Sequence, residues 1–423
     1  MYYLPSLCFS CAEMSLNLWK LYSPRKTIKD KTGKNIVFVD GVRTPFLMSG
    51  TDYAKGIVKK TGISPEIIDY VIYGTVIQEV KTSNIGREAA LSAGYPEKTP
   101  AHTVTMACIS SNQGITTGIG MIAAGAIDVA VAGGVEFMSD IPIRHSRKMR
   151  SLLLKMNKAK TPVDTLKLLA SFRPDYLVPE LPAIAEFSSG ETMGHSADRL
   201  AASFKVSREE QDKYALRSHT LAQEAFEKGY LTDLLPFTCK QWCKSVKHGK
   251  LSSLKPAFIK PHGTITAANA SFLTDGASAC LIMTEEKAKQ LGLKPKAYLR
   301  DFVYVSQDPK DQLLLGPTYA TPKVLERAGL GVQDIDVWEV HEAFAGQILA
   351  NLRAMDSDWF AKEFMNRSQK VGVPDIDKWN KWGGSLSIGH PFAATGFGLI
   401  AACAAGGQGV GMIIERHPDG KAT

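Results

Sequence analysis

The strongest constraint on the fold of this chain is an alternation of short apolar runs with helix-like segments, which occurs once in each half. Runs of this kind suit buried strands, and the spacing between them suits helices. In the first half, the predicted strands lie at 35–40, 67–76 and 128–135, with a helix that begins near Cys108. In the second half, they lie at 297–305, 335–340, 384–388, 399–403 and 411–415. The repetition predicts a duplicated α/β unit.

The domain organisation follows from this repetition. The region between the two sets of strands is richer in charge and helix formers, and it carries prolines at 162, 174, 179 and 182. We interpret it as an insertion carried by the first half. The predicted parts are a leader (1–34), an N-terminal half (35–140 and 255–285), an inserted loop domain (141–254) and a C-terminal half (286–423).

Composition excludes several classes of protein. The 423 residues are 44% hydrophobic and 22% charged, as in an ordinary soluble globular protein. The net charge of +8 suits a phosphorylated ligand or an anionic surface, but it is too small to indicate nucleic acid. The longest uncharged stretch, 103–127, contains four consecutive polar residues and four glycines, so it predicts a buried helix and not a membrane span.

The cysteines argue against a disulfide framework and against a metal site. Their number is odd, seven in the whole chain, which favours a reducing compartment. Cys8 and Cys11 have metal-ligand spacing but no second pair nearby, and Cys239, Cys243 and His248 lie far downstream. We predict no metal.

Two segments have an unusual charge pattern. The leader is apolar to Trp19 and then basic to Lys34, which fits a transit peptide or a disordered leader about equally. The segment 144–160 alternates seven basic residues with leucines and a methionine. A basic amphipathic helix can lie on an anionic membrane, and the alternatives are a solvated helix face or a subunit contact.

Three separated segments carry residues suited to chemistry. Cys108 stands near the start of the uncharged helix, where free N–H groups and the helix dipole stabilise a thiolate. His390 follows a glycine-flanked run at 380–391 and precedes a proline, and Cys403 precedes a glycine-rich turn. Each segment taken singly is weak evidence for catalysis, and Cys108 by itself also fits a buried structural thiol. Together they supply two thiols and a base.

At this point the sequence resembles a known family. The segment 380–391 (NKWGGSLSIGHP) matches the histidine signature of the thiolases, and the resemblance extends from about 35 to 415. Supporting stretches are VDGVRTPF at 39–46, GTVIQEVKTSN at 74–84, ETMGHSADRLA at 191–201, TDGASA at 274–279 and HEAFAGQILAN at 341–351. His341 stands where most thiolases have asparagine, as in the branch that forms the β subunit of the mitochondrial trifunctional enzyme. The resemblance implies duplicated α/β halves in α-β-α-β-α layers.

The resemblance also implies roles for individual residues. Cys108 would be the acylated nucleophile, His390 the base that activates it, and Cys403 the second acid/base. The N–H groups of Cys108 and Ala405 would form one oxyanion hole, while His341 and His390 would line the other. Ser271 would contact the pantetheine of CoA. We interpret Glu342 as structural.

The reaction implied by the resemblance is the cleavage of 3-oxoacyl-CoA by CoA, giving acetyl-CoA and a shortened acyl-CoA in fatty-acid β-oxidation. CoA is a co-substrate, and no metal or redox cofactor is needed. The implied setting is a homodimer that forms a hetero-oligomer with a hydratase/dehydrogenase α subunit at the matrix face of the mitochondrial inner membrane, with 144–160 as a membrane contact.

Two alternatives stay open. One is a thiolase-fold subunit without turnover, which acts by binding partners or membrane. The other is a condensing enzyme of the ketoacyl synthase type, although such sites use two histidines in place of the pair His390 and Cys403.

The second half is shorter than the family pattern. Only ten residues connect Ile388 to Leu399, at or below the length that a parallel crossover with a helix requires. We therefore predict that the helix after His390 is missing or reduced to a stub. Ala393 also replaces the glycine usual at its position, and the segments 53–60 and 237–254 are contracted too.

Overall fold

The computed structural model describes residues 27–44, 60–183, 185–235, 251–398 and 401–420. Several sequence predictions lie outside these residues. They are the leader up to residue 26, the possible metal ligands Cys8, Cys11, Cys239, Cys243 and His248, and most of the two contracted segments at 53–60 and 237–254.

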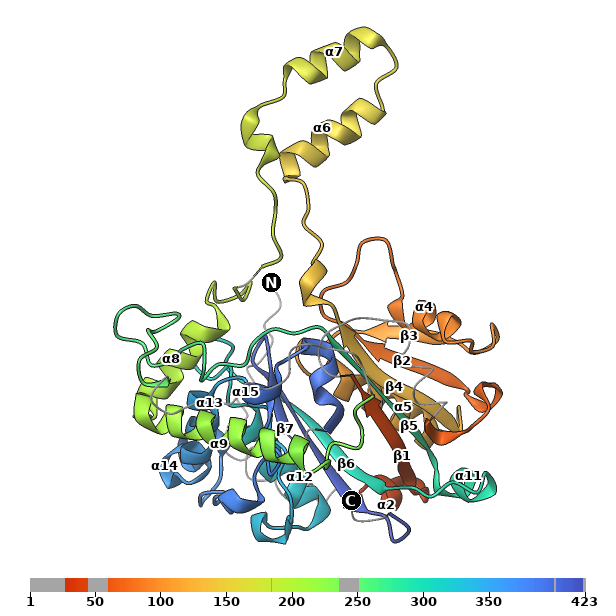
Figure 1. Cartoon of the computed structure of the whole chain (residues 1–423), viewed down its shortest axis with the longest axis vertical. Helices are drawn as coiled ribbons and strands as arrows, with labels where there is room; N and C mark the ends of the chain where they lie inside the picture. The colour runs from red at the N-terminus through yellow and green to blue at the C-terminus, as the bar shows by residue number, and fades with distance from the viewer. Residues whose placement is uncertain (1–26, 45–59, 184, 236–250, 399–400, 421–423) are drawn as a thin grey trace, which may run out of the picture.

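One mixed sheet runs through the described part of the chain, in the order β3-β2-β4-β5-β1-β6-β8-β7 (Figure 1). Its strands are β1 (Ile36–Arg43), β2 (Tyr70–Gly74), β3 (Ala101–Val104), β4 (Val129–Glu136), β5 (Gly276–Thr284), β6 (Ala297–Ser306), β7 (Ala401–Ala404) and β8 (Gln408–Arg416). β2 runs parallel to both β3 and β4, and the remaining pairs are antiparallel. The short pairing of β1 with β6 joins the five strands of the first half to the three of the second.

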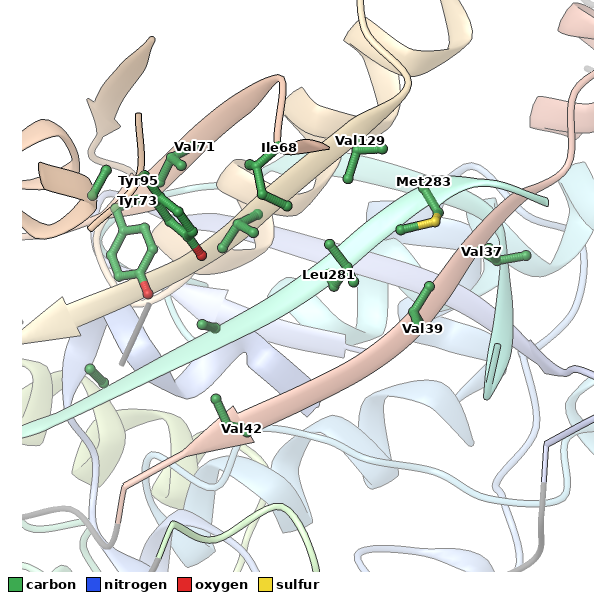
Figure 2. Close-up of a cluster of buried hydrophobic side chains, with 14 of the residues drawn as sticks. Val37, Val39, Val42, Ile68, Val71, Tyr73, Tyr95, Val129, Leu281 and Met283 are labelled. Atoms are coloured by element: carbon green, nitrogen blue, oxygen red, sulfur yellow. The ribbon is translucent and has the colours of Figure 1, made fainter. Parts of the chain in front are cut away.

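The apolar sequences of β4 and β5 reflect burial on both faces of the sheet. Because side chains alternate along a strand, Val129, Val131, Leu281 and Met283 enter one apolar cluster (Figure 2). Their neighbours Ala130, Ala132, Cys280 and Ile282 enter a second cluster on the opposite face. Both strands are buried along their whole length.

Most of the α-helices are capped at the N-terminus by a side chain, and α9 is the longest of those described, with 20 residues. The α-helices are α2 (Ile28–Thr32), α4 (Ile85–Ser92), α5 (Ser110–Ala123), α6 (Arg147–Asn157), α7 (Pro162–Ala170), α8 (Met193–Ser203), α9 (Arg208–Glu227), α11 (Glu285–Gln290), α12 (Gly316–Ala328), α13 (Ala345–Met355), α14 (Asp358–Met365) and α15 (Ser385–Ile388). The 3₁₀ helices are η1 (Pro65–Ile67), η2 (Met138–Asp140), η3 (Pro174–Leu177), η4 (Val332–Asp334), η5 (Ile376–Lys378) and η6 (Phe392–Gly398). No helix among the described residues is long and apolar enough to span a membrane.

The uncharged helix α5 is buried as predicted, and it lies between the two halves. Ile115, Ile119 and Ile122 share one apolar cluster with Val410 and Met412 of the second half. A hydroxyl contact of 2.7 Å between Thr116 and Tyr304 joins the same halves, so α5 sets their relative position.

Between β4 and β5, the described residues form two pairs of α-helices. Helices α8 and α9 pack against α13 of the second half. Helices α6 and α7 form a hairpin that stands well away from the rest of the molecule (Figure 1). The boundaries 141–254 given above for this insertion stay a prediction.

Two predicted strands of the second half are wrong. Within 384–388, Gly384 caps the single helical turn α15 (Ser385–Ile388), because a short apolar run bounded by glycines fits a turn of helix as well as a strand. Residues 335–340 form no strand in the described structure and make only isolated bridges, Trp338 with Trp379 and Val340 with Ala401. The predicted loss of the helix after His390 is confirmed, since η6 is a seven-residue stub.

Candidate active site

Cys108 is presented by a tight turn between β3 and α5. The preceding residue, Ala107, has φ +45°, in the left-handed region that non-glycine residues rarely adopt. The hydroxyl of Ser110 holds the turn, because it accepts a 2.8 Å hydrogen bond from the N–H of Met106 and donates a 2.7 Å bond to the carbonyl of Ala107. Backbone strain at this position is characteristic of functional sites.

The Cys108 thiol is enclosed, although part of the residue reaches the surface. Burial raises its pKa to about 12, and the nearby carboxyl group of Glu136 adds to the rise. Hydrogen bonds from the N–H groups of Ala405 and Cys108 itself oppose it. The expectation of a lowered pKa is therefore wrong, because burial outweighs both N–H groups, so a base has to take the proton.

The two histidines lie against each other, with ring centroids 4.2 Å apart. The Nδ1 of His390 is 2.7 Å from the hydroxyl of Thr395, which itself donates to the carbonyl of Pro391. When the Thr395 hydroxyl donates to Pro391 it accepts from Nδ1–H, and in that tautomer of His390 the lone pair lies on Nε2. This buried Nε2 has no hydrogen-bond partner in the described structure, as expected of a nitrogen held ready to accept a proton.

Both histidines are neutral near pH 7. Burial lowers the pKa of His341 to about 4, and its Nδ1 lies 2.9 Å from the hydroxyl of Ser385. Burial, with a smaller effect from His341, lowers the pKa of His390 well below its ordinary value.

Cys403 lies in β7, beside the stretch that carries His341. The N–H of His341 donates to the carbonyl of Ala401 at 3.1 Å, which aligns the two segments. Burial raises the pKa of the Cys403 thiol, and the nearby Cys108 raises it further. The two thiols, which are 295 residues apart in the chain, are therefore close enough to interact electrostatically.

Ser271 lies on a segment that runs past both histidines. Its N–H donates to the carbonyl of Ala343 at 2.9 Å, and the carbonyl of the next residue, Phe272, accepts a 2.8 Å bond from the N–H of His390. Ser271 is half-buried, and its role toward CoA stays a prediction.

Two carboxylates and one hydroxyl at this site were not recognised as functional in the sequence. Glu136 accepts bonds from the N–H groups of Val76, Ile77 and Ala393, and burial raises its pKa to about 7. The second carboxylate is that of Glu342, beside His341, and the hydroxyl is that of Thr395. No charge pattern or spacing marked them, because each acts through contacts that the fold creates. Among the described residues, no group of three His, Cys, Asp or Glu side chains is arranged to hold a metal ion.

Comparison with known proteins explains this arrangement. Residues 36–286 match the family model for the thiolase N-terminal domain, and residues 293–397 match that for the thiolase C-terminal domain. The chain belongs to the thiolase family. This thiolase is 61% identical to "Trifunctional enzyme subunit beta, mitochondrial" of Bos taurus, over 93% of this chain and 91% of the relative.

Two further comparisons agree. The thiolase is 57% identical to "Probable 3-ketoacyl-CoA thiolase" of Caenorhabditis elegans, over 92% of this chain and 96% of the relative. The crystal structure of human mitochondrial 3-ketoacyl-CoA thiolase in complex with CoA superposes with a TM-score of 0.75 at 28% identity, over 93% of this chain and all of the other. The thiolase fold predicted from the sequence is confirmed.

Proposed function

We propose that this thiolase is an acetyl-CoA C-acyltransferase, which cleaves 3-oxoacyl-CoA with CoA in fatty-acid β-oxidation. The observation that carries the proposal is that the buried Cys108 thiol accepts a hydrogen bond from the N–H of Ala405, two residues after Cys403. The buried Nε2 of His390, in addition, has no hydrogen-bond partner among the described residues. The names of its relatives support the same activity.

In the first half-reaction, Nε2 of His390 takes the proton of the Cys108 thiol, and the thiolate attacks the 3-oxo carbon of the substrate. The N–H groups of Cys108 and Ala405 stabilise the oxyanion that forms. The C2–C3 bond then breaks and leaves the acyl group on Cys108. The departing acetyl-CoA carbanion takes its proton from the Cys403 thiol, while His341 and His390 line the pocket for its thioester oxygen.

In the second half-reaction, the Cys403 thiolate takes the proton of the incoming CoA thiol. The CoA thiolate attacks the acyl group, and Cys108 leaves and recovers its proton from His390. Every group starts and ends neutral, which fits the raised pKa values of both thiols and the lowered pKa values of both histidines. Ser271 would contact the pantetheine of CoA, and no metal or redox cofactor takes part.

The second candidate is a thiolase-fold subunit without turnover. The observation that favours it is the stub η6, which stands directly after His390 in place of the crossover helix of the family pattern. Against it, the stub is anchored to the first half, since the N–H of Ala393 bonds Glu136 and the carbonyl of Ala394 accepts from the hydroxyl of Ser278 at 3.1 Å.

Single-turnover acylation separates the two candidates. The purified protein is mixed with a long-chain 3-oxoacyl-CoA and its intact mass is read, beside a Cys108→Ala control. An acyl adduct on the parent protein alone supports the enzyme. No adduct, from protein that circular dichroism shows to be folded, supports the inactive subunit.

The setting of the enzyme is proposed from the names of its relatives, which are mitochondrial β subunits of a trifunctional enzyme. We expect this chain to act in mitochondria, as a homodimer that assembles with a hydratase/dehydrogenase α subunit. Co-purification of that subunit with a tagged chain from mitochondria is the direct measurement.

The hairpin of α6 and α7 is proposed to contact the inner membrane. Leu154, Val163 and Leu166 are each at least 60% exposed on it. Lys148 and Arg150 pair with Asp175 and Glu180 within the hairpin, at 2.7 and 2.5 Å. The lysines at 155, 158 and 160 make no ion pair in the part of the chain that the structure describes, so they are available to anionic headgroups.

A further inference from the structure

Glu342 is a fully buried carboxylate without a cationic partner in the described structure, next to His341. It accepts four hydrogen bonds, from the hydroxyl of Tyr214 (2.9 Å), the hydroxyl of Ser218 (2.6 Å), the side-chain amide of Asn380 (2.8 Å) and the N–H of Leu386 (3.3 Å). Burying a charge in this way is costly unless donors satisfy it, and here the donors come from three separate segments.

The direction of the two hydroxyl bonds is fixed by other contacts. Tyr214 accepts a 3.0 Å bond from the indole N–H of Trp379, so its own proton is directed to Glu342. Ser218 accepts a 3.2 Å bond from the N–H of Gly384 and lies 3.2 Å from the hydroxyl of Ser387, which donates to the carbonyl of Gly384 at 2.8 Å. The proton of Ser218 is therefore directed to Glu342, at the shorter distance of 2.6 Å.

The other two hydrogen bonds to Glu342, from Asn380 and Leu386, also have a fixed direction. Asn380 accepts from the N–H of Val340 at 2.8 Å and donates to the carbonyl of Val340 at 2.9 Å, which excludes a flip of its amide. Leu386 contributes a backbone N–H, which is always a donor. Each oxygen of Glu342 therefore faces two donors, Oε1 those of Tyr214 and Asn380, and Oε2 those of Ser218 and Leu386.

The space around the carboxylate is closed. A Cβ atom at Gly384 would lie 2.5 Å from the carboxyl group of Glu342, so the chain entering α15 packs directly on it. From α15, Ser385 contacts His341, and Gly389 with φ +92° turns the chain into His390. The carboxylate thus holds the turn that supports both histidines.

We propose that Glu342 is a positioning residue of the thiolase reaction: its carboxylate fixes α15, and through it the orientation of His390 toward Cys108. The inference rests on the proposed function. Its physical basis is that only an acceptor on both oxygens satisfies all four donors, a condition that a carboxylate meets and an amide does not.

The variant Glu342→Gln tests this directly, because either orientation of the amide sets its NH₂ group against Asn380 or against Leu386. We expect single-turnover acylation of Cys108 by a 3-oxoacyl-CoA at pH 7 to fall by about 10²-fold, the contribution of a positioned general base. We also expect the pH for half-maximal alkylation of Cys108 by iodoacetamide to rise by about one unit, since the thiol loses its base.

The matched control is Asp198→Asn in α8. Asp198 is also buried, at 5% exposure, and accepts bonds from the N–H groups of Thr264 and Ile265, away from α15. The amide creates a similar conflict there. We expect a loss of thermal stability from this variant, with acylation rate and alkylation profile within about twofold of the parent protein.

The proposal is overturned if Glu342→Gln is folded and either acylates as fast as Asp198→Asn or keeps the parent alkylation profile. If Glu342→Gln does not fold, Ser218→Ala decides, because it removes one of the four donors. We expect about a tenfold slower acylation from it, and an unchanged rate contradicts the proposal. A parent protein that forms no adduct refutes the proposed function, whereas the alkylation profile still tests the positioning of His390 without substrate.

Discussion

The hydroxyl of Thr395 is the sharpest test of how His390 works. Its oxygen lies 2.7 Å from Nδ1 of His390. In the mechanism proposed above it accepts Nδ1–H, which leaves the unpartnered Nε2 to take the Cys108 proton. Thr395→Val removes the hydroxyl at nearly constant volume and leaves a buried N–H without its acceptor. Such a loss costs about 1–3 kcal/mol. At about 1.4 kcal/mol for each factor of ten in rate, acylation of Cys108 should slow by about 5- to 150-fold.

The assay is quenched single-turnover acylation followed by intact mass, with thermal unfolding measured on the same samples. Thr395→Ser keeps the hydroxyl and serves as the control, which we expect to stay within about threefold of the parent. Parent-like acylation by the folded valine variant would refute the reasoning, and so would equal losses in the valine and serine variants.

Three further results are expected. His341→Asn should reduce the loss of unfolding free energy that the parent protein shows between pH 6.5 and 4, as measured by urea unfolding at several pH values. The folded state holds the His341 pKa at about 4, so in this range only the unfolded chain gains a proton at His341. In the parent protein this difference destabilises the fold by a free energy on the order of 3 kcal/mol. Cys403→Ala should still form some acyl adduct on Cys108 in a single turnover but lose steady-state turnover by at least about 10²-fold, and full turnover would exclude Cys403 as the acid/base. Changing Lys155, Lys158 and Lys160 to glutamate should weaken flotation with cardiolipin-containing vesicles at low salt, whereas unchanged flotation would remove the membrane proposal.

The sequence predicted the features that depend on the local order of apolar, polar and charged residues. The stretch around α5 carries no charge, and such a helix has to be buried. The apolar runs at β1, β2, β4, β6, β7 and β8 were long enough, or well enough bounded, to predict strands near their observed positions. The ten-residue connection after Ile388 predicted a stub because it is too short for a full crossover helix. Cys108, His390 and Cys403 could be predicted as site residues because each stands in a distinctive segment.

Prediction from the local sequence was wrong where the same residues suit more than one secondary structure. The run at 384–388 was expected to be a strand, but it is the turn α15, because Gly384 packs on Glu342 and Gly389 adopts a positive φ. The run at 335–340 was also expected to be a strand, but its only β pairing in the described chain is two isolated bridges, to Trp379 and Ala401.

The tertiary structure alone decided the electrostatics of the site. A lone cysteine at a helix start suggested a lowered pKa, but enclosure raises it, because burial of a thiolate outweighs two N–H groups. Glu342 stood beside a candidate histidine and was interpreted as structural, since a single glutamate carries no periodic signal. Its donors come from residues 38 to 128 positions away. The sequence by itself determined which reactive groups the chain owns, and folding determined their protonation, because that depends on distant neighbours and on exclusion of water.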